Sequence, residues 1–272
     1  MEKKKILELY DIHKTFSMDT NPLNDKKALR GVSLTIYEGD FVSVIGSNGS
    51  GKSTLLNCIA GRFPIEEGSI ILNGRELRKD SEEKRAKYIA RVFQDPLEGT
   101  IASMSLFENL SIASRRGERQ SPFRWALSKK KEVAFAELLK SLNLGLENRL
   151  NSPMGTFSGG QRQSITLLMA TLKKPELLLL DEHTAALDPK TARTVMELTN
   201  QMVREHNIPT LMITHNMKDA IAYGNRLIMM NEGKIIFEAE GEEKKNLKVQ
   251  DLIDKFNALG EGTLSDSQIL AN

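Results

Sequence analysis

A glycine-rich stretch, residues 46–54, constrains the fold of this chain more than any other part of its sequence. It reads Gly-Ser-Asn-Gly-Ser-Gly-Lys-Ser-Thr, follows the apolar run 41–45 and precedes a helix-like run at 55–60. A strand, a glycine-rich turn, a Lys-Ser pair and a helix form the context of a phosphate-binding loop, or P-loop. The sequence therefore predicts an α/β protein with a P-loop core and a nucleotide as ligand.

The residue types of the P-loop predict the part that each plays. The residues expected to contact the nucleotide are Gly46, Ser47, Asn48, Gly49, Ser50, Gly51, Lys52, Ser53 and Thr54. Glycine lets successive N–H groups point at one anion, and the helix that begins near Lys52 adds the positive end of its dipole. Lys52 should reach the β- and γ-phosphates, and Ser53 should ligate Mg²⁺. The alternative is a glycine turn before an ordinary helix. Such a turn does not require glycines, a lysine and a serine at these spacings after an apolar run.

Composition narrows the class of protein. The formal net charge of the 272 residues is +2, so no strong field argues for nucleic acid as a partner. The one cysteine, Cys58, excludes an internal disulfide and indicates a reducing compartment. No apolar run is long enough to span a bilayer, and the apolar part of the N-terminus is too short for a signal peptide. We therefore expect a cytoplasmic protein that associates with a membrane only through a partner.

Further apolar patterns predict an antiparallel β portion beside the core. The strands assigned to it are residues 6–12, 31–37, 68–72 and 88–93. Asn73-Gly74 after the third of these is a strong hairpin signal. The polar stretch 18–27 is expected to form an exposed loop.

The middle of the chain has helical patterns and predicts an α-helical subdomain inserted at about 95–172. Its first helix is marked by Met104, Leu106, Phe107 and Leu110, and its second by the face Val133, Ala136, Leu139 and Leu142. The basic stretch 114–131, which contains the only tryptophan, is interpreted as a loop. A solvated surface is the simpler interpretation of its charge.

A second glycine motif begins the last helix of this subdomain. Ser158 is placed to cap a helix, and Gly159, Gly160 and Gln161 follow it. Glycine leaves the first N–H groups of the helix approachable, which makes a second anion site. A helix start without a ligand is the equally good alternative.

Polar residues follow two runs that predict buried parallel strands. Asp181 and Glu182 end the run of four leucines at 177–180, and His215 follows the run 210–214. Ligands bind at the carboxyl ends of such strands. Asp181 is expected to hold Mg²⁺ and Glu182 to polarise the attacking water. The alternatives are a solvated acidic loop and a structural histidine. Asp188-Pro189 then begins a helix.

Together these motifs resemble those of the ATP-binding subunits of ABC transporters, over residues 6 to about 240. The P-loop, the Ser158–Gln161 signature and the 177–182 strand occur in the family's order. The resemblance implies the ABC ATPase fold and a head-to-tail dimer, with ATP held between the P-loop of one copy and the signature of the other. The roles that it implies are adenine stacking for Phe16, sensing of Mg²⁺ and of the membrane subunit for Gln94, a γ-phosphate switch for His215, and an interface crossing for Ala186, Leu187 and Asp188.

The chain also departs from the family pattern. His183 follows Glu182 where proline is commonest, and an exposed loop histidine is the expected interpretation. Phe157 replaces a usual leucine, which should be tolerated. The stretches 94–96, 99–100 and 181–189 resemble a bacterial importer group, some of whose members are linked to aromatic amino acids such as tryptophan. Residues 241–272 are expected to form one amphipathic helix and a polar tail.

The resemblance predicts an ATP-hydrolysing subunit that powers substrate import through separate permease subunits at the cytoplasmic face of the membrane. An extracellular substrate-binding protein would be an indirect partner. A short helix of the permease is expected beside residues 94–110, with Met104 and Phe107 as its contacts. The ATPase of an exporter is the alternative. A soluble ABC ATPase acting on DNA or ribosomes fits less well, because such proteins carry tandem ATP domains, heptads or cysteine-rich sites.

Overall fold

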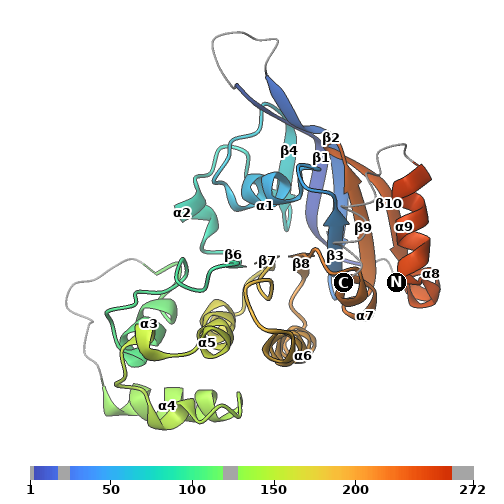
Figure 1. Ribbon diagram of the computed structural model, residues 1–272. Helices are drawn as coiled ribbons and strands as arrows, with labels where there is room; N and C mark the ends of the chain where they lie inside the picture. Colours follow the sequence, from blue (N-terminus) through green and yellow to red (C-terminus); the bar gives the residue numbers. More distant parts are fainter. Residues whose placement is uncertain (1–2, 18–24, 119–127, 259–272) are drawn as a thin grey trace.

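The computed structural model describes residues 3–17, 25–118 and 128–258, in which two β-sheets enclose the P-loop helix (Figure 1). The strands are β1 (Lys5–Phe16), β2 (Lys26–Tyr37), β3 (Phe41–Gly46), β4 (Glu67–Leu72), β5 (Arg75–Glu76), β6 (Ile89–Val92), β7 (Leu177–Asp181), β8 (Thr210–Ile213), β9 (Arg226–Asn231) and β10 (Lys234–Glu240).

The larger sheet has the strand order β10-β9-β3-β8-β7-β6. All its neighbours pair in parallel except β9 and β10, so the predicted mostly parallel core is confirmed. Every residue of β3 is buried, as are the four leucines of β7. A strand that is covered on both faces needs apolar side chains at consecutive positions, and the sequence of β7 meets that need.

The smaller sheet is antiparallel, with the order β2-β1-β4-β5. The predicted hairpin at Asn73-Gly74 is confirmed, because it joins β4 to β5. Two predictions are corrected. Lys26 and Lys27 belong to β2 rather than to a loop, since they pair with Phe16 and Thr15 at the end of β1. The strand predicted at 88–93 is not antiparallel: β6 lies at the edge of the larger sheet, parallel to β7.

The α-helices are α1 (Lys52–Ala60), α2 (Glu82–Arg85), α3 (Leu106–Ala113), α4 (Lys129–Lys140), α5 (Gly159–Thr171), α6 (Pro189–Glu205), α7 (Met217–Ala222), α8 (Gly241–Asn246) and α9 (Val249–Ala258). Short 3₁₀ turns lie at Leu146–Asn148 and Met154–Thr156. Leu55, Leu56 and Ile59 of α1 are buried in one core with strands of both sheets. This packing fixes the P-loop, which immediately precedes α1.

Helices α3, α4 and α5 lie between β6 and β7 in the chain and share a second core with α6 (Figure 1). Phe107 is buried there and packs edge-on against Phe135 at 5.8 Å between ring centroids. The prediction that Phe107 contacts a membrane subunit is therefore wrong. The predicted face of α4 also needs correction, because Val133 is 63% exposed and Phe135 takes the buried position.

The outer parts of the chain differ in small ways from their predictions. Residues 129–131 begin α4, so the loop predicted at 114–131 is shorter, and its residues 119–127, with Trp125, lie outside the described residues. The amphipathic helix predicted near 249–256 is confirmed as α9, and α8 is an additional helix. Among the residues that the structure describes, no helix is long and apolar enough to cross a membrane.

Candidate nucleotide site

The P-loop adopts a conformation that only glycine permits at two positions. Gly51 has a φ of 102° and directly precedes the first residue of α1. A Cβ atom at Gly46 would lie 2.4 Å from the carbonyl oxygen of Met230, which no side chain can accommodate. Since Gly51 has no side chain with which to cap α1, the first N–H groups of this helix have no side-chain cap and can bind an anion.

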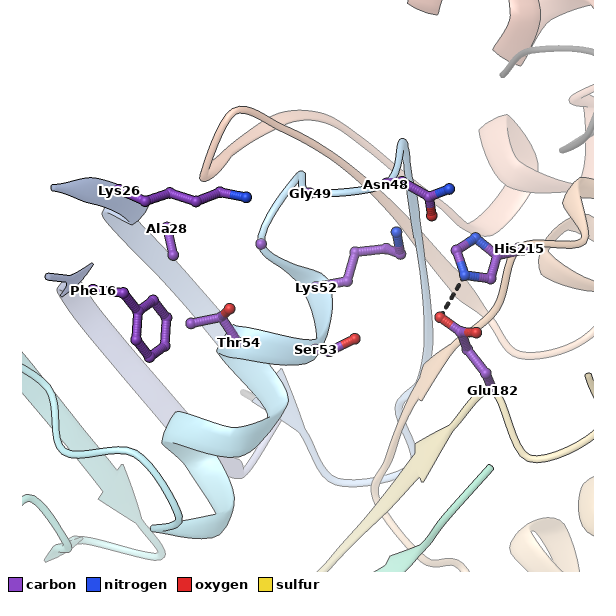
Figure 2. Close-up of a pocket in the computed structure, with 11 residues that line it drawn as sticks. Phe16, Lys26, Ala28, Asn48, Gly49, Lys52, Ser53, Thr54, Glu182 and His215 are labelled. Carbon is purple, nitrogen blue, oxygen red and sulfur yellow. Dashed lines mark ion pairs between the residues drawn. The ribbon is translucent and has the colours of Figure 1, made fainter. Parts of the chain in front are cut away.

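A cavity of about 230 Å³ extends along the P-loop, from Phe16 at one end to Glu182 and His215 at the other (Figure 2). Its remaining lining residues are Lys26, Ala28, Asn48, Gly49, Gly51, Lys52, Ser53 and Thr54. An aromatic ring at one end and cationic, hydroxyl and carboxylate groups at the other match a base and a polyphosphate. Lys26 and Ala28 were missed from the sequence, because they were assigned to a loop or left without a role.

Phe16 is held in place by a second aromatic ring. Its centroid lies 5.2 Å from that of Phe63, and the two rings meet edge to face. Nζ of Lys14 lies 5.2 Å from the centroid of Phe16, and the partly buried Phe16 ring lines the cavity. The ring at the end of β1 can therefore stack on a planar base.

Lys52 is only 5% exposed and points along the loop that precedes it. Its Nζ donates hydrogen bonds to the carbonyl oxygens of Gly46, at 2.8 Å, and Ser47, at 3.0 Å. Burial lowers the pKa of Lys52 from its ordinary value, while the charges of Glu182 and Asp181 act in the opposite direction. The ammonium group is thus positioned beside the N-terminus of α1, where an anionic ligand would replace the carbonyl partners.

Glu182 and His215 approach each other from the ends of two neighbouring strands. The Oε1 atom of Glu182 lies 2.5 Å from Nε2 of His215 (Figure 2). The Glu182 side chain is 13% exposed and the His215 side chain 33%. Glu182 has a φ of 46°, the left-handed conformation that is uncommon for residues other than glycine. Such backbone strain is found most often at functional sites.

Asp181 has a partner that the sequence did not predict. Arg91 of β6 donates from Nη2 to Oδ2 of Asp181 at 2.6 Å and from Nη1 to Oδ1 of Asn57, in α1, at 2.8 Å. Its side chain is 10% exposed. The sequence did contain a sign of this ion pair, an arginine within the apolar run 89–92. A buried charge is rare unless it is paired.

Oxygen donors at the end of β7 and the start of α1 suit magnesium. In the described part of the chain, no group of three or more His, Cys, Asp or Glu side chains is arranged to hold a metal ion. Mg²⁺ commonly takes one or two protein oxygens together with phosphate oxygens. Ser53 and Asp181 fit that mode of binding, in which the ion depends on the nucleotide for its other ligands.

The other predicted site residues lie outside this cavity. Gln94 is exposed just beyond β6. Ser158 and Gln161 form a capping box at the start of α5, with hydrogen bonds of 3.3 and 3.1 Å, and Asp188 caps α6. A Cβ at Gly160 would lie 2.1 Å from Thr191 in α6, so Gly160 allows these two helices to pack closely.

His183 is buried, so the expected exposed loop histidine is wrong. The residue is 2% exposed, and its Nε2 lies 3.1 Å from the hydroxyl oxygen of Thr199 in α6. Burial lowers the pKa of His183 to about 4, so the ring is neutral at neutral pH. A neutral ring with a hydroxyl partner meets the requirement that buried polar groups be hydrogen-bonded.

The sequence matches proteins of known function. The family model described as ABC transporter matches residues 29–185. The tyrosine transport ATP-binding protein of Clostridioides difficile (strain R20291) is 43% identical over 252 residues, which cover 92% of this chain and 98% of that protein. The phosphonates import ATP-binding protein PhnC of Alcaligenes faecalis is 33% identical, over 86% of this chain and 82% of that protein.

Solved structures give the same result for the fold. A nucleotide-free ATP-binding cassette from an ABC transporter has a TM-score of 0.72 and 27% identity, covering 97% of this chain and 98% of that chain. A dimeric cassette in a post-hydrolysis state, bound to ADP and Pi, has a TM-score of 0.70 and 29% identity, covering 86% of this chain and 98% of that chain.

Proposed function

The chain belongs to the ABC transporter family of ATPases, and we propose on that premise that it powers the import of an amino acid through separate permease subunits. The cavity between Phe16 and the Glu182–His215 pair carries the ATP-hydrolysing part of the proposal, because it holds a stacking ring, a P-loop and an acid–base pair. The proposed division of the chain is an ATP-binding domain over 1–240, with the helical subdomain 95–172 inserted, followed by the C-terminal helix and tail, 241–272.

The proposed roles combine the geometry of the cavity with the roles that the family resemblance implies, the latter alone for Gln94, which lies outside the cavity. Phe16 stacks on adenine, and the P-loop amides with Lys52 bind the phosphates. Glu182 accepts a proton from the attacking water, and His215, bonded to it at 2.5 Å, contacts the γ-phosphate. Ser53, Asp181 and Gln94 are the proposed protein ligands of magnesium, which neutralises phosphate charge when it is bound.

We propose that a second copy of the chain completes the site. Ser158–Gln161 and Asp188 lie together at the starts of α5 and α6, away from the cavity of their own chain. A head-to-tail dimer would place the start of α5 of one copy, where Ser158 and Gln161 form the capping box, opposite the P-loop of the other. The dimeric arrangement of the cassette bound to ADP and Pi supports this proposal.

A groove between β6 and the helical subdomain is the proposed docking surface for the permease, at the cytoplasmic face of the membrane. It encloses about 390 Å³ and is lined mainly by apolar side chains. Phe93 and Gly99, on either side of Gln94 in sequence, belong to this lining, as does Ile112 of α3, which is 41% exposed. We therefore propose Ile112 as a contact with the permease, in place of Phe107.

A charged side chain introduced at an apolar position of the groove should weaken the binding of the permease. We expect Ile112→Lys to reduce the amount of permease recovered with the chain by about tenfold, as loss of a central interface contact does. Val133→Lys, at a 63% exposed position on α4 outside the groove, should not change it. Co-purification measures the effect, with ATP binding as a check on the fold. Equal recovery of both variants would place the docking surface elsewhere.

The substrate proposal rests on the likeness to the tyrosine transport protein. Its test is uptake of radiolabelled tyrosine into proteoliposomes that contain the chain, its permease subunits and their extracellular binding protein. We expect ATP-dependent uptake that is inhibited by an excess of aromatic amino acid and is not inhibited by a phosphonate. Movement of substrate in the opposite direction would identify an exporter, and uptake of a different solute would refute the amino-acid assignment alone.

A further inference from the structure

The side chain next to Glu182, that of His183, does not line the nucleotide cavity and is anchored on α6. His183 meets Thr199, which is 16 residues further along the chain and fully buried in α6. The hydroxyl of Thr199 donates its own proton to the carbonyl oxygen of Val195 at 2.8 Å. It must therefore accept a hydrogen bond from Nε2 of His183, which carries the ring proton.

The segment from His183 to Asp188 is held against α6 at both of its ends, and the hydrogen bond of His183 holds one of them. At the far end, Asp188 accepts a hydrogen bond from the backbone N–H of Thr191 at 3.1 Å. At the near end, His183 is held by Thr199 at 3.1 Å. Both ends of the segment between Glu182 and Asp188 are therefore hydrogen-bonded to residues of the same helix, α6.

The backbone of Glu182 needs such support. Its φ of 46° lies in the left-handed region, which costs about 1–3 kcal/mol and persists only where the surroundings over-determine it. Its N–H donates to Ile213 at 3.0 Å, and its carbonyl accepts from Ala185 at 2.9 Å. Both of these hydrogen bonds fix the backbone N–H and C=O groups of Glu182. The contact of the His183 side chain with α6 instead fixes the path of the chain just after Glu182.

We propose that His183 and Thr199 are positioning residues that hold Glu182 in the conformation from which its carboxylate reaches His215 and the nucleotide cavity. The inference rests on the proposed catalytic role of Glu182. Neither residue lines the cavity, so their loss should affect hydrolysis without affecting nucleotide affinity. A displacement of about 1 Å in a reacting group typically costs on the order of a hundredfold in rate.

Thr199→Val tests the proposal, because valine keeps the shape of the side chain and removes only the hydroxyl. We expect kcat for ATP hydrolysis to fall by about tenfold or more, with KM and the Kd for ATP within about twofold of the wild type. Thr199→Ser, which restores the acceptor, should restore kcat. The double variant with His183→Leu should be no slower than the slower single variant, since one interaction is removed in both.

Thr171→Val is the matched control. Thr171 is also buried in a helix and donates to the carbonyl four residues earlier, Leu167, at 2.9 Å, but it has no histidine partner among the described residues. It should lower thermal stability as Thr199→Val does and leave kcat unchanged. Equal kcat values for the two valine variants would overturn the proposal.

Two further measurements keep the result interpretable. If Thr199→Val does not fold, His183→Gln is compared with His183→Leu, because glutamine can present an N–H near the position of Nε2. A higher kcat for the glutamine variant supports the proposal, and equal values contradict it. Glu182→Gln is assayed in parallel: if that variant hydrolyses ATP normally, the catalytic role of Glu182 is wrong, and the positioning role is overturned with it.

Discussion

Replacing Glu182 by glutamine is expected to preserve ATP binding and to lower the rate of hydrolysis by about a hundred- to ten-thousand-fold. A positioned general base contributes a factor of that size, and an amide cannot accept the proton of the attacking water. Glutamine keeps the size of the side chain and can still bond to His215, 2.5 Å away in the wild type. Phosphate release under single-turnover conditions measures the loss.

The same variant should accumulate as an ATP-bound dimer, because hydrolysis is the step that would normally open it. Size-exclusion chromatography with Mg-ATP shows this directly. Glu232→Gln is the control, since Glu232 also has a positive φ, of 43°, but lies on the surface between β9 and β10. A Glu182→Gln protein that stays monomeric and hydrolyses ATP at the wild-type rate contradicts the assignment.

Replacing Lys52 by alanine is expected to weaken ATP binding itself, by about ten- to a hundredfold. A hydrogen bond to a charged group contributes about 1.5–3 kcal/mol. The Nζ atom of Lys52 lies on the P-loop, 2.8 and 3.0 Å from the carbonyl oxygens of Gly46 and Ser47. His215→Ala should instead slow hydrolysis and leave affinity largely unchanged, because His215 lies at the far end of the cavity from Phe16.

Titration of each variant with a fluorescent ATP analogue separates the two roles. Lys26→Ala provides the control for charge alone, since Lys26 lines the same cavity from an exposed position on β2. Its effect should be several times smaller than that of Lys52→Ala, because solvent screens an exposed charge. If Lys52→Ala and His215→Ala lose equal affinity, the division between binding and chemistry is wrong.

Local signals in the sequence were sufficient for the core of the protein. The P-loop, the apolar strands β3 and β7 and the caps at Ser158 and Asp188 were identified, and the ABC ATPase fold that they implied is confirmed by the likeness to solved cassettes. Each of these features depends on neighbours within a few residues: glycine where the backbone turns, side-chain oxygens at helix starts, and consecutive apolar residues in covered strands.

Features that depend on distant partners were decided only by the tertiary structure. Residues 88–93 form a strand in either sheet by pattern alone, and pairing with β7 determines which. Phe107 packs against Phe135, and His183 contacts Thr199. No local pattern in the sequence connects the members of either pair. Arg91 reaches Asp181 across 90 residues of sequence. A periodic pattern shows that a face is apolar or that a charge is buried, but the element that packs there is set by the topology of the whole chain.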